Sequence, residues 1–284
     1  MKTITLSQID HETLLDTFEE AFGGYAVKFD RREINAMLVR RGYNPTLSFG
    51  ITDPAGRLVA FILNGTGDYD GRPTCYDCGT GTLPDYRGQG LAGALFAHAC
   101  PLLRAAGIEQ YLLEVLCDNT AAISVYRRSG LETTATYHCF RQDTAALVTD
   151  RPARLPLSIR PIDPSLLHNL TGFVDFTPSW QNSLQSILRG RDGLIIRAAF
   201  SGDTPVGYCV SDPLTGDIAQ IAVDPAERRQ GIATALLDDA RQHSRSRTMK
   251  VLNIEAGCQS MHHFMHAVNF APALSQYAMR RRPL

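Results

Sequence analysis

The sequence predicts an α/β protein built from two copies of one domain. A twelve-residue stretch occurs twice, as PDYRGQGLAGAL at residues 84–95 and as PAERRQGIATAL at residues 225–236, with the same residue at seven positions. Each copy follows a strand-like segment and leads into an apolar, helix-like segment, which predicts a strand–turn–helix unit at both places. The two copies lie about half of the 284-residue chain apart. This spacing is far longer than a solenoid repeat and is typical of the length of one domain.

The composition is that of an ordinary globular protein, with 44% hydrophobic residues, 20% charged residues and a net charge of −1. This near balance of charge argues against nucleic acid or an anionic membrane as a partner. The first residues lack the apolar segment of a secretory signal, and no apolar run approaches the length of a membrane span. Seven scattered cysteines fit free thiols. We therefore expect a cytoplasmic protein.

The domain boundaries are expected at a segment that contains prolines and arginines. We predict an N-terminal domain at 1–143, a linker at 144–156 and a C-terminal domain at 157–284. In the first domain the patterns predict helices at 11–22, 31–41, 88–106 and 119–128, and strands at 4–9, 47–52, 58–65, 75–83, 111–116 and 132–141. In the second they predict helical segments up to residue 188 and at 231–244, and strands at 157–162, 193–200, 206–210, 217–223 and 251–256.

The repeated stretch has the features of an anion site. Gly90 and Gly231 carry no Cβ, so the main chain can approach a ligand closely. The first amides of the helix that follows have no partner inside the helix, and the helix dipole adds partial positive charge there. Such a turn suits a pyrophosphate. Neither copy has the Gly-Lys-Ser/Thr of a P-loop or the three spaced glycines of a dinucleotide-binding fingerprint.

Arg87-x-x-Gly90-x-Ala92 and Arg228-x-x-Gly231-x-Ala233 resemble the acyl-CoA loop of the Gcn5-related N-acetyltransferases, Arg/Gln-x-x-Gly-x-Gly/Ala. The resemblance implies two tandem domains of α/β (α+β) class. Each has a mostly antiparallel mixed sheet, flanking helices and a splayed strand pair that holds acyl-CoA, and acetyl-CoA is the cosubstrate. The implied cofactor-binding residues are Thr82, Leu83, Arg87, Gly88, Gln89, Gly90, Leu91, Ala92 and Asn119 in the first copy, and Ala222, Val223, Arg228, Arg229, Gln230, Gly231, Ile232 and Ala233 in the second.

A second block supports the resemblance in the first copy only. Asn119, Ala122 and Tyr126 share one helical face, followed by Gly130 and Leu131, and this resembles the family's Asn-x-x-Ala-x-x-x-Tyr-x-x-x-Gly-Phe block. In that family the tyrosine hydroxyl lies beside the thioester sulfur, which implies that Tyr126 is the general acid. From the residues alone, a helix-capping asparagine and a core tyrosine remain the alternative.

Asp77 and Glu114 are the acids expected nearest to the cleft, and either is a candidate general base for a cationic acceptor. In the second copy Met265 stands at the position of Tyr126, and a thioether cannot donate a proton. His262, His263 and His266 lie nearby, and His262 and His266 share a helical face. This pair lacks an obvious third metal ligand, so we predict no metal site. A redox or zinc role for Cys75 and Cys78 is not favoured, because residues i and i+3 of a strand point to opposite faces.

These observations predict an acetyl-CoA-dependent N-acyltransferase that acetylates a primary amine of a small-molecule acceptor. The alternative is an acyl-CoA-binding sensor without turnover, most plausible for the C-terminal half. The first two helices would cover the acceptor, with Phe22, Tyr25, Phe29 and Tyr43 as pocket aromatics or as core residues. We expect either a monomer with an internal pseudo-dimer or a homodimer.

Overall fold

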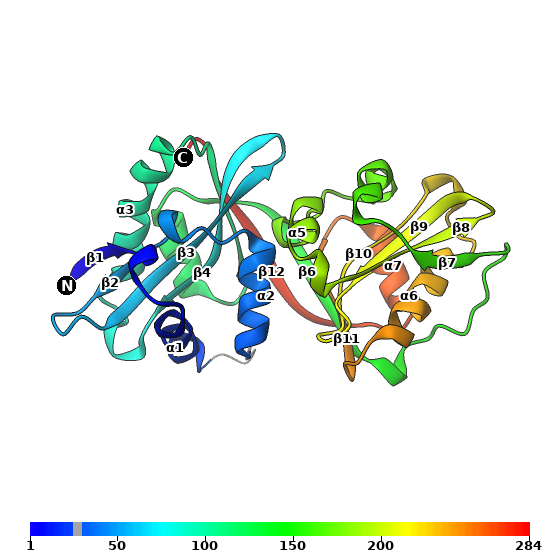
Figure 1. The fold of residues 1–284 in the computed structure, drawn as a ribbon, viewed down its shortest axis with the longest axis horizontal. Coiled ribbons are helices and arrows are strands. Elements are labelled where there is room, and N and C mark those ends of the chain that lie inside the picture. Colours follow the sequence, from blue (N-terminus) through cyan, green and yellow to red (C-terminus); the bar gives the residue numbers. More distant parts are fainter. Residues whose placement is uncertain (25–29) are drawn as a thin grey trace. The chain divides into compact units, whose positions relative to one another are not determined.

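A computed structural model describes residues 1–24 and 30–284 of the chain (Figure 1). The chain forms two compact units, residues 1–134 with 277–284 and residues 135–276. We call them the N-terminal and the C-terminal unit. This division differs from the predicted domains at 1–143 and 157–284, because each unit takes one segment from the other half of the sequence. Within the described residues, no helix has both the length and the hydropathy needed to cross a membrane.

The N-terminal unit is a mixed sheet with helices, as predicted. Its strands are β1 Lys2–Thr5, β2 Phe49–Thr52, β3 Leu58–Tyr69, β4 Arg72–Thr82 and β5 Gln110–Leu116. Its helices are α1 His11–Phe22, α2 Arg31–Arg41, α3 Leu91–Ala105 and α4 Thr120–Arg128. Neighbouring strands from β1 to β4 are antiparallel, whereas β4 and β5 run parallel. A parallel pair needs a crossover connection, which α3 supplies here.

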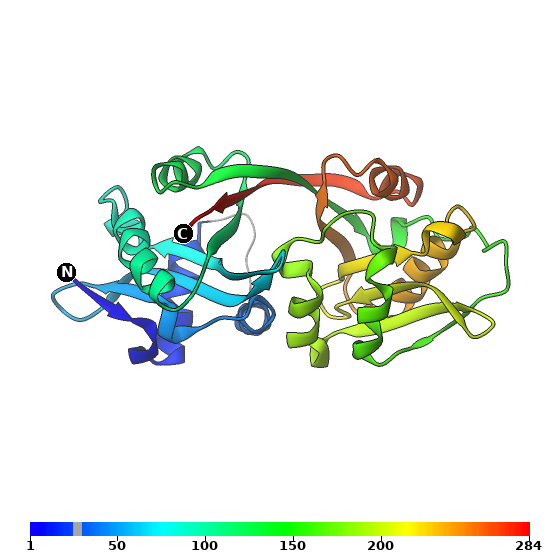
Figure 2. The same cartoon turned by 90° about the horizontal axis from the view of Figure 1, so that it is seen from above.

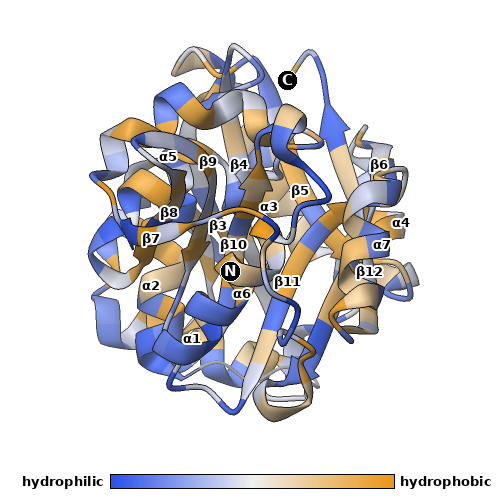
Figure 3. Cartoon of the chain, turned by 90° about the vertical axis from the view of Figure 1, so that its right-hand side faces the viewer, coloured by the Kyte–Doolittle hydropathy of each residue, from blue (hydrophilic) through white to orange (hydrophobic). Residues whose placement is uncertain are grey.

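Helices cover both faces of this sheet (Figure 2). Phe61 of β3 stacks on Phe18 of α1 at 5.9 Å between ring centroids. Phe49 of β2 meets His98 of α3 edge-on at 5.0 Å. Phe61 is paired with Gly50 of β2, so the two residues share one face of the sheet. Phe49 is the neighbour of Gly50 in the chain and therefore points to the opposite face. Hydrophobic residues, drawn in orange in Figure 3, occur in the strands and on parts of the helices, and β3 is buried from Leu58 to Leu63.

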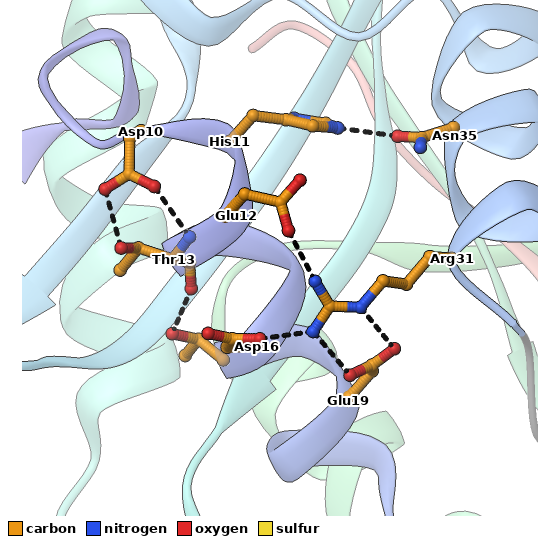
Figure 4. Close-up of polar contacts among 9 residues, drawn as sticks. Asp10, His11, Glu12, Thr13, Asp16, Glu19, Arg31 and Asn35 are labelled. Carbon is orange, nitrogen blue, oxygen red and sulfur yellow. Dashed lines mark hydrogen bonds and ion pairs between the residues drawn. The ribbon is translucent and has the colours of Figure 1, made fainter.

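Helices α1 and α2, expected to cover the acceptor, are tied together by one arginine (Figure 4). Arg31, the first residue of α2, pairs with Glu12 at 2.6 Å and Glu19 at 3.1 Å, and also with Asp16, all on α1. Exposed ion pairs add little stability individually. Three carboxylates on one guanidinium nevertheless fix how the helices face each other. The predicted pocket aromatics Tyr25 and Phe29 lie outside the described residues.

The C-terminal unit repeats this sheet. Its strands are β6 Glu132–Asp143, β7 Ser158–Pro161, β8 Ile195–Ser201, β9 Thr204–Ser211, β10 Asp217–Val223 and β11 Thr248–Glu255. They lie in the order β6-β11-β10-β9-β8-β7, and only β10 and β11 are parallel. Its α-helices are α5 Leu184–Arg189, α6 Ile232–His243 and α7 Gln259–Ala267. The predicted helical segment up to residue 188 is mostly 3₁₀ turns, at 164–173 and 180–182. Gly172 and Pro178 interrupt it, which explains why long α-helices do not form.

Each unit is completed by a segment from the other half of the sequence. Residues 135–143 of β6 pair with β11, from Tyr137 opposite Glu255 to Asp143 opposite Thr248. Strand β12, Ala271–Arg281, ends in the N-terminal unit, where the C-terminus also lies (Figure 2). There the Leu284 amide donates to the Glu109 carbonyl at 3.0 Å. A cut at the predicted linker would therefore leave both sheets incomplete.

Candidate active site

The repeated turns have the geometry of an anion cradle. Strand β4 ends in a short 3₁₀ turn, and Gly90, at φ +75°, precedes α3 without a side-chain cap. The amides of residues 88–92 donate to no other residue that the structure describes. In the second copy Gly231, at φ +86°, precedes α6 in the same way. Both turns thus leave a row of main-chain donors at a helix N-terminus, as the sequence predicted.

The arginine of each motif has a role that the sequence did not reveal. Arg87 donates from Nε to the Thr82 carbonyl at 3.2 Å and from Nη2 to the Ala21 carbonyl at 3.0 Å. Arg228 repeats this, with the Val223 carbonyl at 3.2 Å and the Phe173 carbonyl at 3.1 Å. The guanidinium groups therefore connect the end of the strand to α1 in the first copy and to the 3₁₀ segment at 164–173 in the second. The main chain, rather than these side chains, is left to receive an anion.

The strands that lead into the turns splay apart, as the resemblance implied. Strand β4 pairs with β5 only from Thr74 to Tyr76, and β10 pairs with β11 only at Asp217 and Ile218. A bulge follows at the same place in both copies, at Cys78 and at Ala219. Beyond the bulge, β4 pairs with no residue of β5 in the part of the chain that the structure describes. Thr82 and Leu83, like Ala222 and Val223 in the second copy, lie at the end of such a splayed strand.

Tyr126 and Asp77 meet beside the first splay. The Tyr126 hydroxyl on α4 donates to Asp77 Oδ2 at 3.2 Å. Asp77 also accepts from the Gly79 amide at 2.9 Å and from Thr80 Oγ1 at 2.8 Å. Burial raises the pKa of Asp77 to about 6, against the opposing effect of these hydrogen bonds. Both oxygens of this carboxylate have partners, so its geometry suits orienting the phenol better than taking a proton from a substrate.

Glu114 lies on β5, across the splay. The Tyr76 hydroxyl donates to Glu114 Oε2, and Oε1 accepts from no described residue. Burial raises the pKa of Glu114 to about 7, although the Tyr76 hydrogen bond and the charge of Arg41 lower it. Arg41 of α2 donates from Nη1 to the Cys78 carbonyl at the bulge, at 2.8 Å. A carboxyl group that is half ionised near neutral pH is well matched to general-base work. Tyr76 and Arg41 were not predicted, since no motif marks them.

Asn119 caps α4 by accepting from the Ala122 amide at 3.1 Å. This is the capping geometry that the sequence left open as an alternative, and a cofactor contact for Asn119 stays a prediction. Of the predicted aromatics, Phe22 packs on Phe18 with ring centroids 4.6 Å apart. Cys75 and Cys78 are both buried free thiols.

The second copy has none of the three candidate groups, Asp77, Glu114 and Tyr126, at the corresponding positions. Asp77 stands directly before the bulge of the first copy, and Ile218 holds that position in the second. The parallel strand pairs place Leu252 of β11 at the position of Glu114 of β5. Helix α7 places Met265, fully buried, where α4 has Tyr126. Among the residues that the structure describes, no three metal-ligating side chains gather, and this includes the histidines of α7.

The second turn lines a cavity of about 460 Å³ inside the C-terminal unit. The predicted residues on its wall are Ala222, Val223, Arg228, Arg229, Gly231, Ile232 and Ala233. Gln230 is the exception: its side chain donates to Glu227 Oε2 at 2.6 Å.

Known proteins resemble this chain in parts of its sequence and in its whole fold. A mycothiol acetyltransferase of Saccharomonospora viridis is 43% identical over 68 residues, which cover 24% of this chain and 22% of that protein. A mycothiol acetyltransferase of an Arthrobacter species is 28% identical over 127 residues, covering 43% of this chain and 39% of that protein. The matched segments thus span well under half of these relatives.

Two solved structures share the fold over nearly the full chain. A tandem GNAT protein from the clavulanic acid biosynthesis pathway has a TM-score of 0.73 at 16% identity, with 100% of this chain and 98% of that one covered. A GCN5-related N-acetyltransferase from Sphaerobacter thermophilus has a TM-score of 0.66 at 14% identity, with 95% and 91% covered. The acetyltransferase (GNAT) family model matches residues 11–131 and 166–270. The chain therefore belongs to the acetyltransferase (GNAT) family.

Proposed function

We propose that the N-terminal unit transfers an acetyl group from acetyl-CoA directly to a primary amine of a small-molecule acceptor. The observation that carries this proposal is the hydrogen bond between Tyr126 and Asp77, with Glu114 on the neighbouring strand, beside splayed strands that lead into an anion cradle. The partial similarity to relatives named mycothiol acetyltransferase supports a small-molecule acceptor.

The cradle and the splay give the unit its substrate-binding role. The amides of residues 88–92 hold the pyrophosphate. The part of β4 beyond the bulge, which no longer pairs with β5, pairs with the pantetheine arm. The thioester then lies near Tyr126 and Glu114. Holding two substrates in reacting geometry is the main gain for a two-substrate transfer.

Glu114 starts the reaction. An acceptor amine is mostly protonated at neutral pH, so it must lose a proton before it can attack. Glu114 takes that proton, directly or through a water molecule, and later releases it to solvent. The amine nitrogen attacks the acetyl carbon, the new C–N bond forms, and the C–S bond breaks.

Tyr126 completes the reaction. Its phenol gives a proton to the departing CoA thiolate, and the second proton of the attacking nitrogen restores the phenol. A thiol of pKa near 8.5 is a good leaving group, so a phenol with a pKa near 10 is acid enough at close range. Before the reaction Asp77 holds the phenol in place through the hydrogen bond at 3.2 Å, and the single phenol proton leaves this bond for the thiolate as the C–S bond breaks.

The second copy supports another role, acyl-CoA binding without turnover. It keeps the cradle at Gly231 but has Ile218, Leu252 and Met265 in place of the reacting groups. An apolar set of this kind can neither take a proton nor donate one.

The test uses the full chain, acetyl-CoA and a panel of amines, with CoA release as the readout. Tyr126→Phe should lower kcat at least about tenfold, in line with general-acid effects of roughly 10²–10⁴, while acetyl-CoA still binds. Tyr208→Phe is the matched control, because the Tyr208 hydroxyl also donates a side-chain hydrogen bond, to Gln220 in the C-terminal unit. Equal rates for Tyr126→Phe and wild type would remove Tyr126 from the mechanism. Binding of acetyl-CoA without release for any amine would favour the sensor.

A further inference from the structure

The predicted linker is built into the C-terminal unit. Before residue 151, Thr149 Oγ1 donates to Asp238 Oδ1 on α6 at 2.8 Å. After residue 154, Leu155 and Leu157 pack against the hydrophobic core of this unit. The chain between these anchors, residues 151–154, is called the strap below. Because it is held at both ends, its position relative to α6 is defined.

The strap lies directly on the second phosphate loop. The Arg154 amide donates to the Gln230 carbonyl at 2.8 Å. A Cβ added at Gly231 would lie 2.9 Å from the Ala153 Cα and 3.0 Å from the Pro152 carbonyl oxygen. A Cβ added at Gly90, in the first copy, would meet no described atom within 4 Å. The strap is therefore a feature of the second copy.

The strap forms one wall of the 460 Å³ cavity. Arg151 and Arg154 of the strap line the cavity together with Arg228 and Arg229 of the loop. The lining also includes Asp175 and Glu227, and a set of apolar side chains. The apolar lining residues are Ile221, Ala222, Val223, Ile232, Met261 and Phe264. The volume is within the range of roughly 300–1,000 Å³ that is common for ligand sites.

Three of the four arginines that line the cavity have no carboxylate partner among the described residues. Arg228 is paired with Asp175 at 2.7 Å, and Glu227 accepts from Gln230. Arg151, Arg154 and Arg229 pair with no carboxylate among the described residues. In the first copy the position of Arg229 is Gly88. Guanidinium groups that line one cavity, in the loop and strap beside a helix N-terminus, create a positive potential that attracts anions, and they bind phosphate oxygens strongly.

We propose that the strap completes a binding site in the C-terminal unit for a phosphorylated ligand with an uncharged tail, and that Arg151 and Arg154 bind its phosphate groups. CoA has this chemistry, with its phosphates at one end and pantetheine at the other. The inference rests on the proposed acyl-CoA binding by the second copy and adds the linker arginines to that site.

Hydrogen exchange on the full chain tests the proposal, because it reports each loop separately. CoA should slow amide exchange in peptides that cover 149–155 and 226–236, and pantetheine, which lacks the phosphates, should not. In Arg151→Ala/Arg154→Ala, half-maximal protection of 226–236 should need at least about tenfold more CoA, as expected for charged hydrogen bonds. Arg245→Ala/Arg247→Ala is the matched control, since it removes the same charge from exposed residues of this unit outside the cavity.

The outcomes separate this inference from the proposed function. Protection of 226–236 at an unchanged CoA concentration in the strap variant would overturn the role of the strap and leave CoA binding intact. Protection of 84–95 alone would overturn the second site and leave the N-terminal transferase intact. Equal protection by pantetheine would overturn the phosphate contact.

Discussion

The pH dependence of turnover gives the sharpest test of the predicted base. Burial raises the pKa of Glu114 to about 7. A carboxyl group accepts a proton only when ionised, so turnover should fall as pH falls through this value. With a pKa of about 7, the ionised fraction is about one eleventh at pH 6 and about ten elevenths at pH 8. The maximal rate should therefore rise about tenfold between these pH values.

Glu114→Gln removes the base but keeps an oxygen that can accept from the Tyr76 hydroxyl. We expect turnover to fall by roughly 10²–10⁴ and the limb between pH 6 and 8 to disappear. The assay follows loss of the thioester at saturating amine, with the amine that gives the fastest CoA release. Comparing variant and wild type with one amine keeps the ionisation of the acceptor constant.

Glu109→Gln is the matched control, because Glu109 is an exposed carboxylate of the same unit that pairs with Arg72 at 3.0 Å. Its profile should equal that of wild type. The reasoning is refuted if the limb survives in Glu114→Gln. An inflection near pH 6 that survives there but vanishes in Asp77→Asn would make Asp77 the base.

Three further predictions concern stability. The pKa of Asp77 is about 6 in the folded state, against 3.8 normally. Ionisation of Asp77 therefore costs the folded state up to about 3 kcal/mol above pH 6 and nothing below about pH 4. Asp77→Asn should raise the free energy of unfolding, measured in urea, at pH 8 but not at pH 4. Gly90→Ala should lower it by about 1 kcal/mol for the positive φ, and Gly231→Ala by more, because its Cβ would also press on the strap; equal losses would contradict this. Deleting residues 277–284 should speed hydrogen exchange in β5 and abolish turnover, because β12 completes that sheet; unchanged exchange in β5 would show that the segment is dispensable.

The sequence predicted best what local chemistry decides. Helix α2 was predicted at its observed bounds, since Asp30 and Glu33 form a capping box and Gly42 ends the helix at φ +73°. Strand β10 was also predicted at its bounds. Both phosphate turns were found because their glycines are needed for the backbone itself. Such features can be read from neighbouring residues alone.

Long-range partners were out of reach of the sequence. The guanidinium of Arg87 binds the carbonyl of Ala21, far away in the chain. The hydroxyl of Tyr76 reaches Glu114 on another strand, and only the parallel pairing of β4 and β5 brings them together. A lone tyrosine in a strand or an arginine at a helix end carries no signal for such a contact.

The exchange of strands was missed for a related reason. An apolar pattern predicts that β6 or β12 is a strand, but it does not predict which sheet the strand joins. The linker was misjudged because prolines and arginines at 151–156 read as a connection. Their place over Gly231 depends on anchors at Thr149 and Leu155, which have no local pattern.

The two copies show a trade between chemistry and stability. Burial of Asp77 and Glu114 opposes their ionisation, so these two carboxyl groups, the proposed partner of Tyr126 and the proposed base, lower the free energy of unfolding of the N-terminal unit when ionised. The C-terminal unit has apolar residues at these positions, which bury without that cost. The N-terminal sheet is complete only with residues 277–284, which follow the whole C-terminal unit in the chain. An N-terminal unit with a complete sheet therefore always comes with a C-terminal unit, whose loop at Gly231 has the role of binding alone under the function proposed above.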